Sequence, residues 1–438
     1  MFKKLLFAFF IASTAINAQK TITGTLTPAD EYKWVIAYQL KPGTQGYATD
    51  SKVTDGKFTL NMPADAKAST YRIVYALPQE EFYFDVLYNG KEDIELTFNE
   101  ESGVAFTASK ENILMSSYFN EAKDLKQQIV DFYKKGSSNK KELAKIYTDL
   151  AKMQASYEEK SNGLIVNNFI KANKSYIPKK HETIYDYVEN KKTHYFDALD
   201  YKNEILQASN FLTDKGLNYV FTSLPLSKIS KTATENILQQ NVQKLAQQMD
   251  GVSEKYRFHM YYELWLYAAG RKYNTTSDFI HRNYIKSLGN ITNNQELVKG
   301  IEVHNRLRFG EKAPEIVWNK GKNKLSTMET ADNYVLVFWS STCSHCLKEL
   351  PKLNDGMANY PKTKVLAYGL EDTDYDWKRV TAKMTNFTHA LGLGKWDNKY
   401  ADIYNISQTP TYIVLDKNKR IIAKPENYDD VLAFLKKQ

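Results

Sequence analysis

Two cysteines, the only ones among 438 residues, stand three positions apart directly after an apolar segment. The apolar segment, Val335–Trp339, is rich in β-branched and aromatic residues, which predicts a buried strand. The residues after Cys343 carry apolar side chains at helical spacing, at Leu347, Leu350 and Leu353, which predicts a helix. The first cysteine is therefore expected where a strand passes into a helix, as in an α/β fold.

This position predicts a chemical role for each cysteine. Free N–H groups and the positive end of the macrodipole at a helix N-terminus favour the thiolate, the nucleophilic form of sulfur. We predict that Cys343 attacks and that Cys346, one turn along, closes a disulfide with it or resolves a mixed one. A protonated His345 between them should lower the pKa of Cys343 and make the pair more oxidising, unless its side chain is only a solvated surface group.

A cysteine pair at this spacing can also supply half of a zinc site or form a purely structural disulfide. Structural zinc needs two further ligands, and the chain has no other cysteine. A structural disulfide across so short a loop would constrain the unfolded chain little. We therefore favour a redox-active disulfide between Cys343 and Cys346, with no metal and no organic cofactor, because the dithiol is itself the redox group.

Further motifs surround the cysteines. They are Trp339-Ser340-x-x-Cys343-x-x-Cys346-x-x-Glu349-x-Pro351, Gly310-x-Lys312-Ala313-Pro314, Tyr404-x-Ile406 and Thr409-Pro410-Thr411. Over roughly residues 309–438 this set resembles the TlpA/ResA-like thiol-disulfide oxidoreductases, exported members of the thioredoxin fold. The resemblance implies a cis bond before Pro410, a substrate-binding surface formed by Thr409, Pro410 and Trp339, and a role for Glu349 in moving the thiol protons.

The sequence departs from the family pattern at several positions. Thr342 replaces a frequent tryptophan, and Ser344 and His345 replace the prolines common between the cysteines. Val337 stands where cytosolic thioredoxins carry a buried aspartate, which leaves Glu349 as the best candidate for proton transfer. Glu349 can also be no more than a charge that is favourable near a helix N-terminus.

The hydrophobic pattern changes twice along the chain. Residues 1–18 have two lysines, an apolar core and small residues, which predicts a secretory signal peptide and not a lipoprotein anchor. Residues 19–109 alternate apolar and polar side chains between turn signals, which predicts a β-sandwich domain. Residues 110–308 show helical periodicity, with Asn139 and Glu142 as an N-cap pair, which predicts an all-α domain of roughly eight or nine helices.

Residues 309–438 complete the predicted multi-domain chain as a thioredoxin-like α/β domain. Its expected element order is strand, helix, strand, helix, strand, strand, helix. The second strand is expected at 364–370, the second helix at 374–384, the third strand at 412–415 and the last helix at 428–436.

We therefore expect a periplasmic thiol-disulfide oxidoreductase that acts on protein substrates with thiols or disulfides, with a membrane-borne electron-transfer protein as a further partner. The formal charge of +8 is spread out, without a basic block, which argues against nucleic acid. The alternative is an envelope binding or adaptor protein whose last domain recognises partners. A peroxidase of the peroxiredoxin type is disfavoured because Leu336 and Ser340 replace its Pro and Thr.

Overall fold

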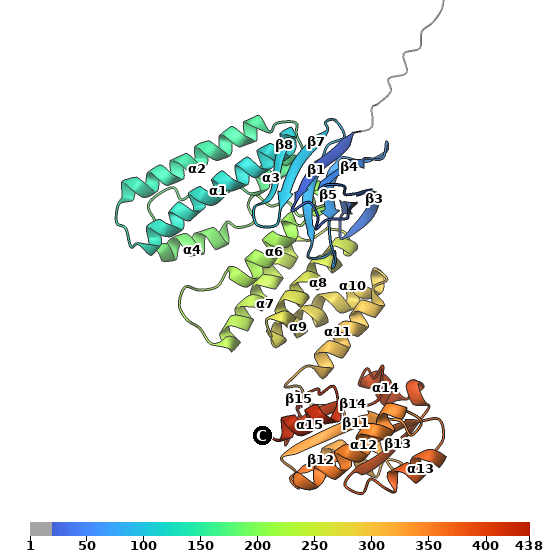
Figure 1. Cartoon of the computed structure of the whole chain (residues 1–438). Helices are drawn as coiled ribbons and strands as arrows, with labels where there is room; N and C mark the ends of the chain where they lie inside the picture. Colours follow the sequence, from blue (N-terminus) through green and yellow to red (C-terminus); the bar gives the residue numbers. More distant parts are fainter. Residues whose placement is uncertain (1–19) are drawn as a thin grey trace, which may run out of the picture. The chain divides into compact units, whose positions relative to one another are not determined.

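The computed structural model describes residues 20–438, so the predicted signal peptide, residues 1–18, lies outside the described residues. The chain forms two compact units, which divide between Thr292 and Asn293 (Figure 1). Within residues 20–438 no helix combines the length and the apolar character that a membrane span requires.

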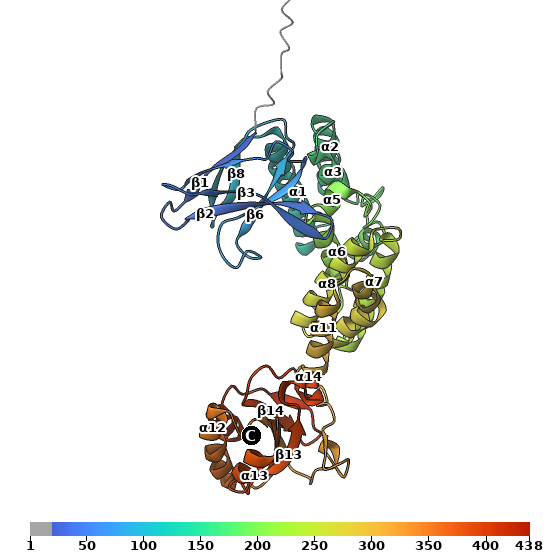
Figure 2. The ribbon, with the colours of Figure 1, turned by 90° about the vertical axis from the view of Figure 1, so that its right-hand side faces the viewer.

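The N-terminal unit begins with two four-stranded sheets. Their strands are β1 (Thr21–Thr27), β2 (Trp34–Lys41), β3 (Thr44–Lys52), β4 (Lys57–Asn61), β5 (Ser69–Val74), β6 (Tyr83–Tyr88), β7 (Ile94–Asn99) and β8 (Gly103–Ala108). The strand orders are β4-β1-β7-β8 and β3-β2-β5-β6, and Figure 2 shows the two layers. Alternate side chains of both sheets, among them Leu60, Leu96 and Val86, share one buried core. The predicted β-sandwich is confirmed.

Helices make up the rest of this unit. They are α1 (Lys110–Lys134), α2 (Lys140–Lys160), α3 (Val166–Ala172), α4 (Ile184–Thr193), α5 (Glu204–Gln207), α6 (Phe211–Thr222), α7 (Lys231–Gln248), α8 (Glu254–Gly270), α9 (Asn274–Ile280) and α10 (Lys286–Ile291). Asn139 caps α2 by accepting the backbone N–H of Glu142, as predicted. The described helices outnumber the prediction because α3, α5, α9 and α10 have seven residues or fewer, too short for a clear apolar period.

A buried asparagine joins the sandwich to the first helix. Asn112 of α1 is 3% exposed. Its side chain accepts the backbone N–H of Leu87 and donates to the Leu87 carbonyl, both at 2.8 Å. Glu92 adds a second connection, because its carboxylate accepts the hydroxyl of Ser109 at the start of the same helix. The first helix therefore starts in a fixed position against strand β6.

The C-terminal unit is built on a five-stranded sheet in the order β13-β12-β11-β14-β15. Its elements are α11 (Gln295–Leu307), β9 (Val317–Trp318), β10 (Asn323–Lys324), β11 (Asn333–Trp339), α12 (Ser344–Gly356), β12 (Thr363–Glu371), α13 (Tyr375–Thr381), β13 (Thr388–Leu393), α14 (Lys399–Ile403), β14 (Thr411–Asp416), β15 (Ile421–Ala423) and α15 (Tyr428–Leu435). Strands β11, β12 and β13 run parallel, and β14 and β15 are antiparallel to their neighbours. The predicted elements are present, but the prediction omitted the short hairpin β9–β10 as well as β13 and α14.

The central strand β11 is buried on both faces. Val335, Val337 and Trp339 face one core, which also contains Leu350 of α12 and Val431 of α15. The residues between them, Tyr334, Leu336 and Phe338, face a second core on the other side of the sheet. A strand with apolar side chains on both faces is typical of a sheet covered by helices on each side.

Helix α11 belongs to the C-terminal unit, which begins at Asn293 and thus before the predicted start at Phe309. Leu307 lies in the core of this unit. Arg306 donates from Nε to the carbonyl of Ile403 at 2.9 Å. These contacts attach the helix to the segment around α14.

Removing the Asn112 side chain tests the link between sandwich and helix. We expect Asn112→Ala to lower the stability of the N-terminal unit by about 2–4 kcal/mol, because two buried backbone groups of Leu87 lose their partner. Hydrogen exchange of the amides in β6 measures this as faster exchange. Asn162→Ala, at an exposed position of the same unit, is the control. Equal exchange in both variants would contradict the structural role of Asn112.

Candidate active site

The loop after β11 places Cys343 at the N-terminus of α12. Cys343 is the N-cap residue, and its Sγ accepts the backbone N–H of Cys346 at 3.3 Å. The Cys343 thiol also donates to the backbone carbonyl of Thr409 at 3.3 Å. The side chain is partly exposed, so the sulfur is both held by the protein and open to solvent.

These contacts change the acidity of Cys343. Partial burial acts to raise the pKa of its thiol, but the Cys346 thiol, the Thr409 side chain and the backbone N–H groups of Cys346 and His345 stabilise the thiolate. The hydrogen bonds outweigh the burial, and the pKa of Cys343 lies below the ordinary value. A lowered thiol pKa of this kind favours the nucleophilic thiolate near neutral pH.

Cys346 has the opposite environment. Its side chain is fully buried in the core that contains Trp339 and Leu350. Burial first, and then the hydrogen bond with Cys343, raise the pKa of the Cys346 thiol above its ordinary value. Both cysteines are free thiols in this structure. One thiol is therefore accessible and acidic, and its neighbour is sequestered and protonated.

The segment Thr409-Pro410 lies beside the sulfur of Cys343, and its peptide bond is cis, as the resemblance implied. A cavity of about 770 Å³ begins at Pro410 and extends over Thr411 to Phe309 and Lys424. The cavity thus begins one residue after the Thr409 carbonyl that contacts Cys343, and it can receive a segment of another molecule.

Residues 332–421 match the family model described as thioredoxin-like. The C-terminal domain belongs to the thioredoxin-like family. No curated protein sequence matches the chain significantly.

Solved structures similar to this chain cover the same region. A domain of a possible thiol-disulfide isomerase from Cytophaga hutchinsonii is 32% identical, with 30% of this chain and 92% of that chain covered and a TM-score of 0.27. The thioredoxin domain of a thiol-disulfide oxidoreductase from Bacteroides vulgatus is 26% identical, with 30% of this chain and 97% of that chain covered and a TM-score of 0.27. A thioredoxin-like protein from Bacteroides caccae is 15% identical, with 60% of this chain and 97% of that chain covered and a TM-score of 0.32.

In the thioredoxin-like domain, Glu349 lies on α12 and contacts two other elements. Its carboxylate accepts the hydroxyl of Tyr412 at 2.9 Å and the backbone N–H of Tyr428 at 3.2 Å. Burial, Glu349 and the charges of both cysteines raise the pKa of Tyr412, which places this tyrosine within electrostatic reach of the thiols. Sequence reasoning included Tyr412 only as a strand residue, since a hydrogen bond over this sequence distance leaves no local signal.

A second carboxylate of the thioredoxin-like domain was missed entirely. Glu371, the last residue of β12, is 2% exposed. It accepts the backbone N–H and the hydroxyl of Ser341 and the hydroxyl of Ser340. Burial raises the pKa of Glu371, and these hydrogen bonds oppose the shift. Glu371 therefore holds the loop that leads into Cys343.

Two predicted site residues have surroundings that differ from the expectation. Trp339 is 0% exposed and packs beneath the cysteines, so its side chain cannot form part of the predicted substrate-binding surface. His345 is exposed, and it lowers the pKa of Cys343 through its backbone N–H. An electronic role for the imidazole stays a prediction. Leu347, expected on the apolar face of the helix, is 43% exposed.

No group of three or more His, Cys, Asp or Glu side chains in residues 20–438 is arranged to hold an ion. The chemistry that this arrangement offers is that of the two thiols.

Alkylation tests the difference between the thiols. Because the pKa of Cys343 is lowered and that of Cys346 is raised, iodoacetamide should modify Cys343 with a midpoint below about pH 8.5, the ordinary thiol value. Cys346 should react only after denaturation. Mass spectrometry of the native reduced protein, sampled over a pH series, measures both rates. Modification of Cys346 before Cys343 in the native protein would contradict the burial of the Cys346 side chain.

Proposed function

We propose that this chain is a thiol-disulfide oxidoreductase in which Cys343 attacks and Cys346 resolves. The observation that carries the proposal is the partly exposed Cys343 sulfur at the start of α12, with a lowered pKa and a buried second thiol in contact. Membership of the thioredoxin-like family supports the same activity. The substrates are protein thiols or disulfides.

The exchange proceeds in two balanced steps. The Cys343 thiolate attacks one sulfur of a substrate disulfide, forms a mixed disulfide and releases the other substrate sulfur as a thiolate. Cys346 loses its proton and attacks the Sγ of Cys343, which closes the intramolecular disulfide and releases the second substrate thiol. Two electrons pass from the dithiol to the substrate, and the reverse sequence oxidises a substrate dithiol.

Substrate binding is assigned to the backbone around Pro410. The Thr409 carbonyl already lies 3.3 Å from the Cys343 sulfur, and the adjoining cavity continues away from it along β14. An extended substrate segment in this cavity would bring its own sulfur next to Cys343. We further propose that the protein acts in the periplasm and requires no metal or organic cofactor, and that a membrane-borne protein supplies or removes electrons.

Substitution of each cysteine separates the two roles. We expect Cys343→Ser to abolish dithiothreitol-dependent reduction of insulin, because the attacking thiol is lost. Cys346→Ser should instead accumulate mixed disulfides with cellular proteins, since attack occurs without resolution. Non-reducing gels followed by mass spectrometry detect them. Activity that survives in Cys343→Ser would contradict the role of Cys343 as the attacking thiol. The absence of any trapped partner would favour the adaptor function over the enzyme.

Glu349 is proposed to accept the proton of Cys346 during resolution. We expect Glu349→Gln to slow turnover by about 10²-fold and to change its pH dependence, while the alkylation rate of Cys343 stays close to that of the wild type. Asp355→Asn, at an exposed position of the same helix, is the matched control. If Glu349→Gln and Asp355→Asn show the same turnover, Glu349 acts only in packing against Tyr412 and Tyr428.

A further inference from the structure

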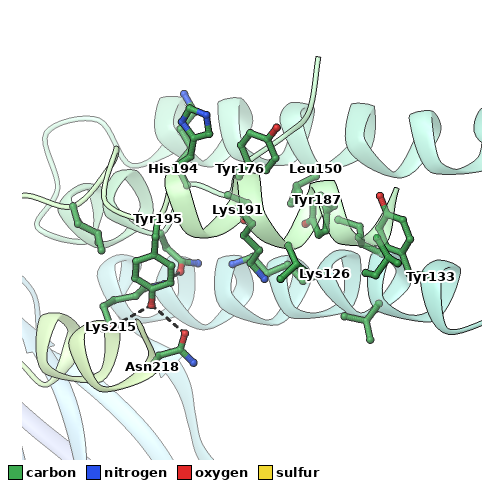
Figure 3. A pocket seen from close by; sticks show the side chains of 18 of the residues that line it. Lys126, Tyr133, Leu150, Tyr176, Tyr187, Lys191, His194, Tyr195, Lys215 and Asn218 are labelled. Atoms are coloured by element: carbon green, nitrogen blue, oxygen red, sulfur yellow. Dashed lines mark hydrogen bonds between the residues drawn. The ribbon is translucent and has the colours of Figure 1, made fainter. Parts of the chain in front are cut away.

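A cavity of about 560 Å³ lies in the helical part of the N-terminal unit (Figure 3). Helices α1, α2, α4 and α6, the end of α3, and the segments that follow α3, α4 and α6 supply its walls. Pockets of this size commonly hold small organic ligands. The thiol chemistry of the thioredoxin-like domain makes no use of this cavity, whose lining residues all come from the N-terminal unit.

The charged groups of the cavity all have one sign. Five lysines and one histidine line it, and none of the lining residues within the described chain is Asp or Glu. His194 has its own partner, Asp197, at 2.7 Å. Lys215 donates from Nζ to the amide oxygen of Asn173 at 2.6 Å. Within residues 20–438, Lys126 and Lys191 have neither a hydrogen-bond nor an ion-pair partner. The side chains that line the cavity therefore carry an excess of positive charge, although Asp214, which does not line the cavity, attracts Lys215.

Three of these lysines act on one another. Burial, followed by repulsion from Lys191, lowers the pKa of Lys126 to about 8. Burial, followed by repulsion from Lys126 and Lys191, lowers the pKa of Lys215 to about 8. Figure 3 shows the Lys126 and Lys191 side chains pointing toward each other. Lys126 and Lys215 are partly buried, and Lys191 is exposed at the mouth of the cavity. Like charges gathered in this way repel one another, and a bound anion would offset the repulsion.

The cavity also has an ordered polar end. The single hydroxyl hydrogen of Tyr195 is shared between the carbonyl of Lys215, at 2.9 Å, and the amide oxygen of Asn218, at 3.1 Å. Figure 3 shows this group at the side of the cavity where Lys215 lies, while Tyr133 and Tyr187 lie beyond Lys126 on the other side. Aliphatic side chains complete the apolar part: Ile129, Val130, Leu150, Ile184, Val188 and Leu226. The polar and apolar parts together match a ligand that is itself amphipathic.

We propose that this cavity binds a small amphipathic carboxylate, with its head group among Lys126, Lys191 and Lys215 and its apolar body along the tyrosine and aliphatic walls. A carboxylate accepts hydrogen bonds from several ammonium groups at once. Glu182, which contacts the lining residue Tyr176, accepts from Tyr176 and Asn190 through Oε1 and is not itself among the residues that line the cavity. The head group thus supplies the missing negative charge.

Calorimetric titration of the full chain with four probes tests the proposal. Octanoate and 3-phenylpropionate carry the head group on an aliphatic and an aromatic body, acetate carries the head group alone, and octan-1-ol carries the body alone. We expect octanoate or 3-phenylpropionate, or both, to bind about tenfold or more tightly than acetate and octan-1-ol. The ratio of the two affinities shows whether the cavity favours an aliphatic or an aromatic ligand. The proposal would be overturned if octan-1-ol bound as tightly as octanoate does, or if neither octanoate nor 3-phenylpropionate bound.

Lysine variants locate the site. We expect Lys126→Gln and Lys191→Gln each to weaken binding of the better acid about tenfold, the loss of one charge-assisted hydrogen bond. Lys123→Gln, at an exposed position of α1 outside the cavity, should bind as the wild type does. Because the substitutions remove repulsion, the thermal midpoint of the ligand-free variants should equal or exceed that of the wild type. Unchanged affinity in both cavity variants, with that midpoint retained, would overturn the assignment.

Discussion

The candidate active site depends on one contact, that of the Cys343 sulfur with the backbone N–H of Cys346 at the N-terminus of α12. A helix N-terminus offers this donor only if the preceding strand ends at the correct residue. Strand β11 is fixed on both sides, by β12 in parallel and by β14 in antiparallel register, so it ends at Trp339. The sheet therefore determines where the sulfur lies, and the helix determines how acidic it is.

Two carboxylates support the two segments that meet at this sulfur. Glu371 holds the loop of Ser340 and Ser341 that precedes Cys343. Glu349 holds Tyr412, which follows the Thr409 carbonyl by three residues along the chain. The sulfur thus lies between two segments that are each hydrogen-bonded to a different acid. This arrangement limits its movement without covering it.

The parts of this structure that local patterns encode could be predicted from the sequence. The strand and helix around Cys343 follow from apolar spacing, and the N-cap at Asn139 from its residue type. Strand β13, Thr388–Leu393, was missed because it has only two large apolar residues, each next to a glycine or alanine, and lies at the sheet edge. Glu371 and Tyr412 could not be found because their partners are distant in sequence. The burial of Trp339 did have a signal, since period-two alternation places it on the same face as Val335 and Val337.

Helix α11 has a practical consequence. The family match starts at residue 332, and the motif resemblance starts at about 309, yet the compact unit includes Leu307 and Arg306. A fragment cut at either of those later points would uncover the apolar surface that Leu307 covers and would release the Ile403 carbonyl from its donor. Truncation for separate expression should therefore begin at Asn293, so that the fragment keeps its first helix and stays soluble.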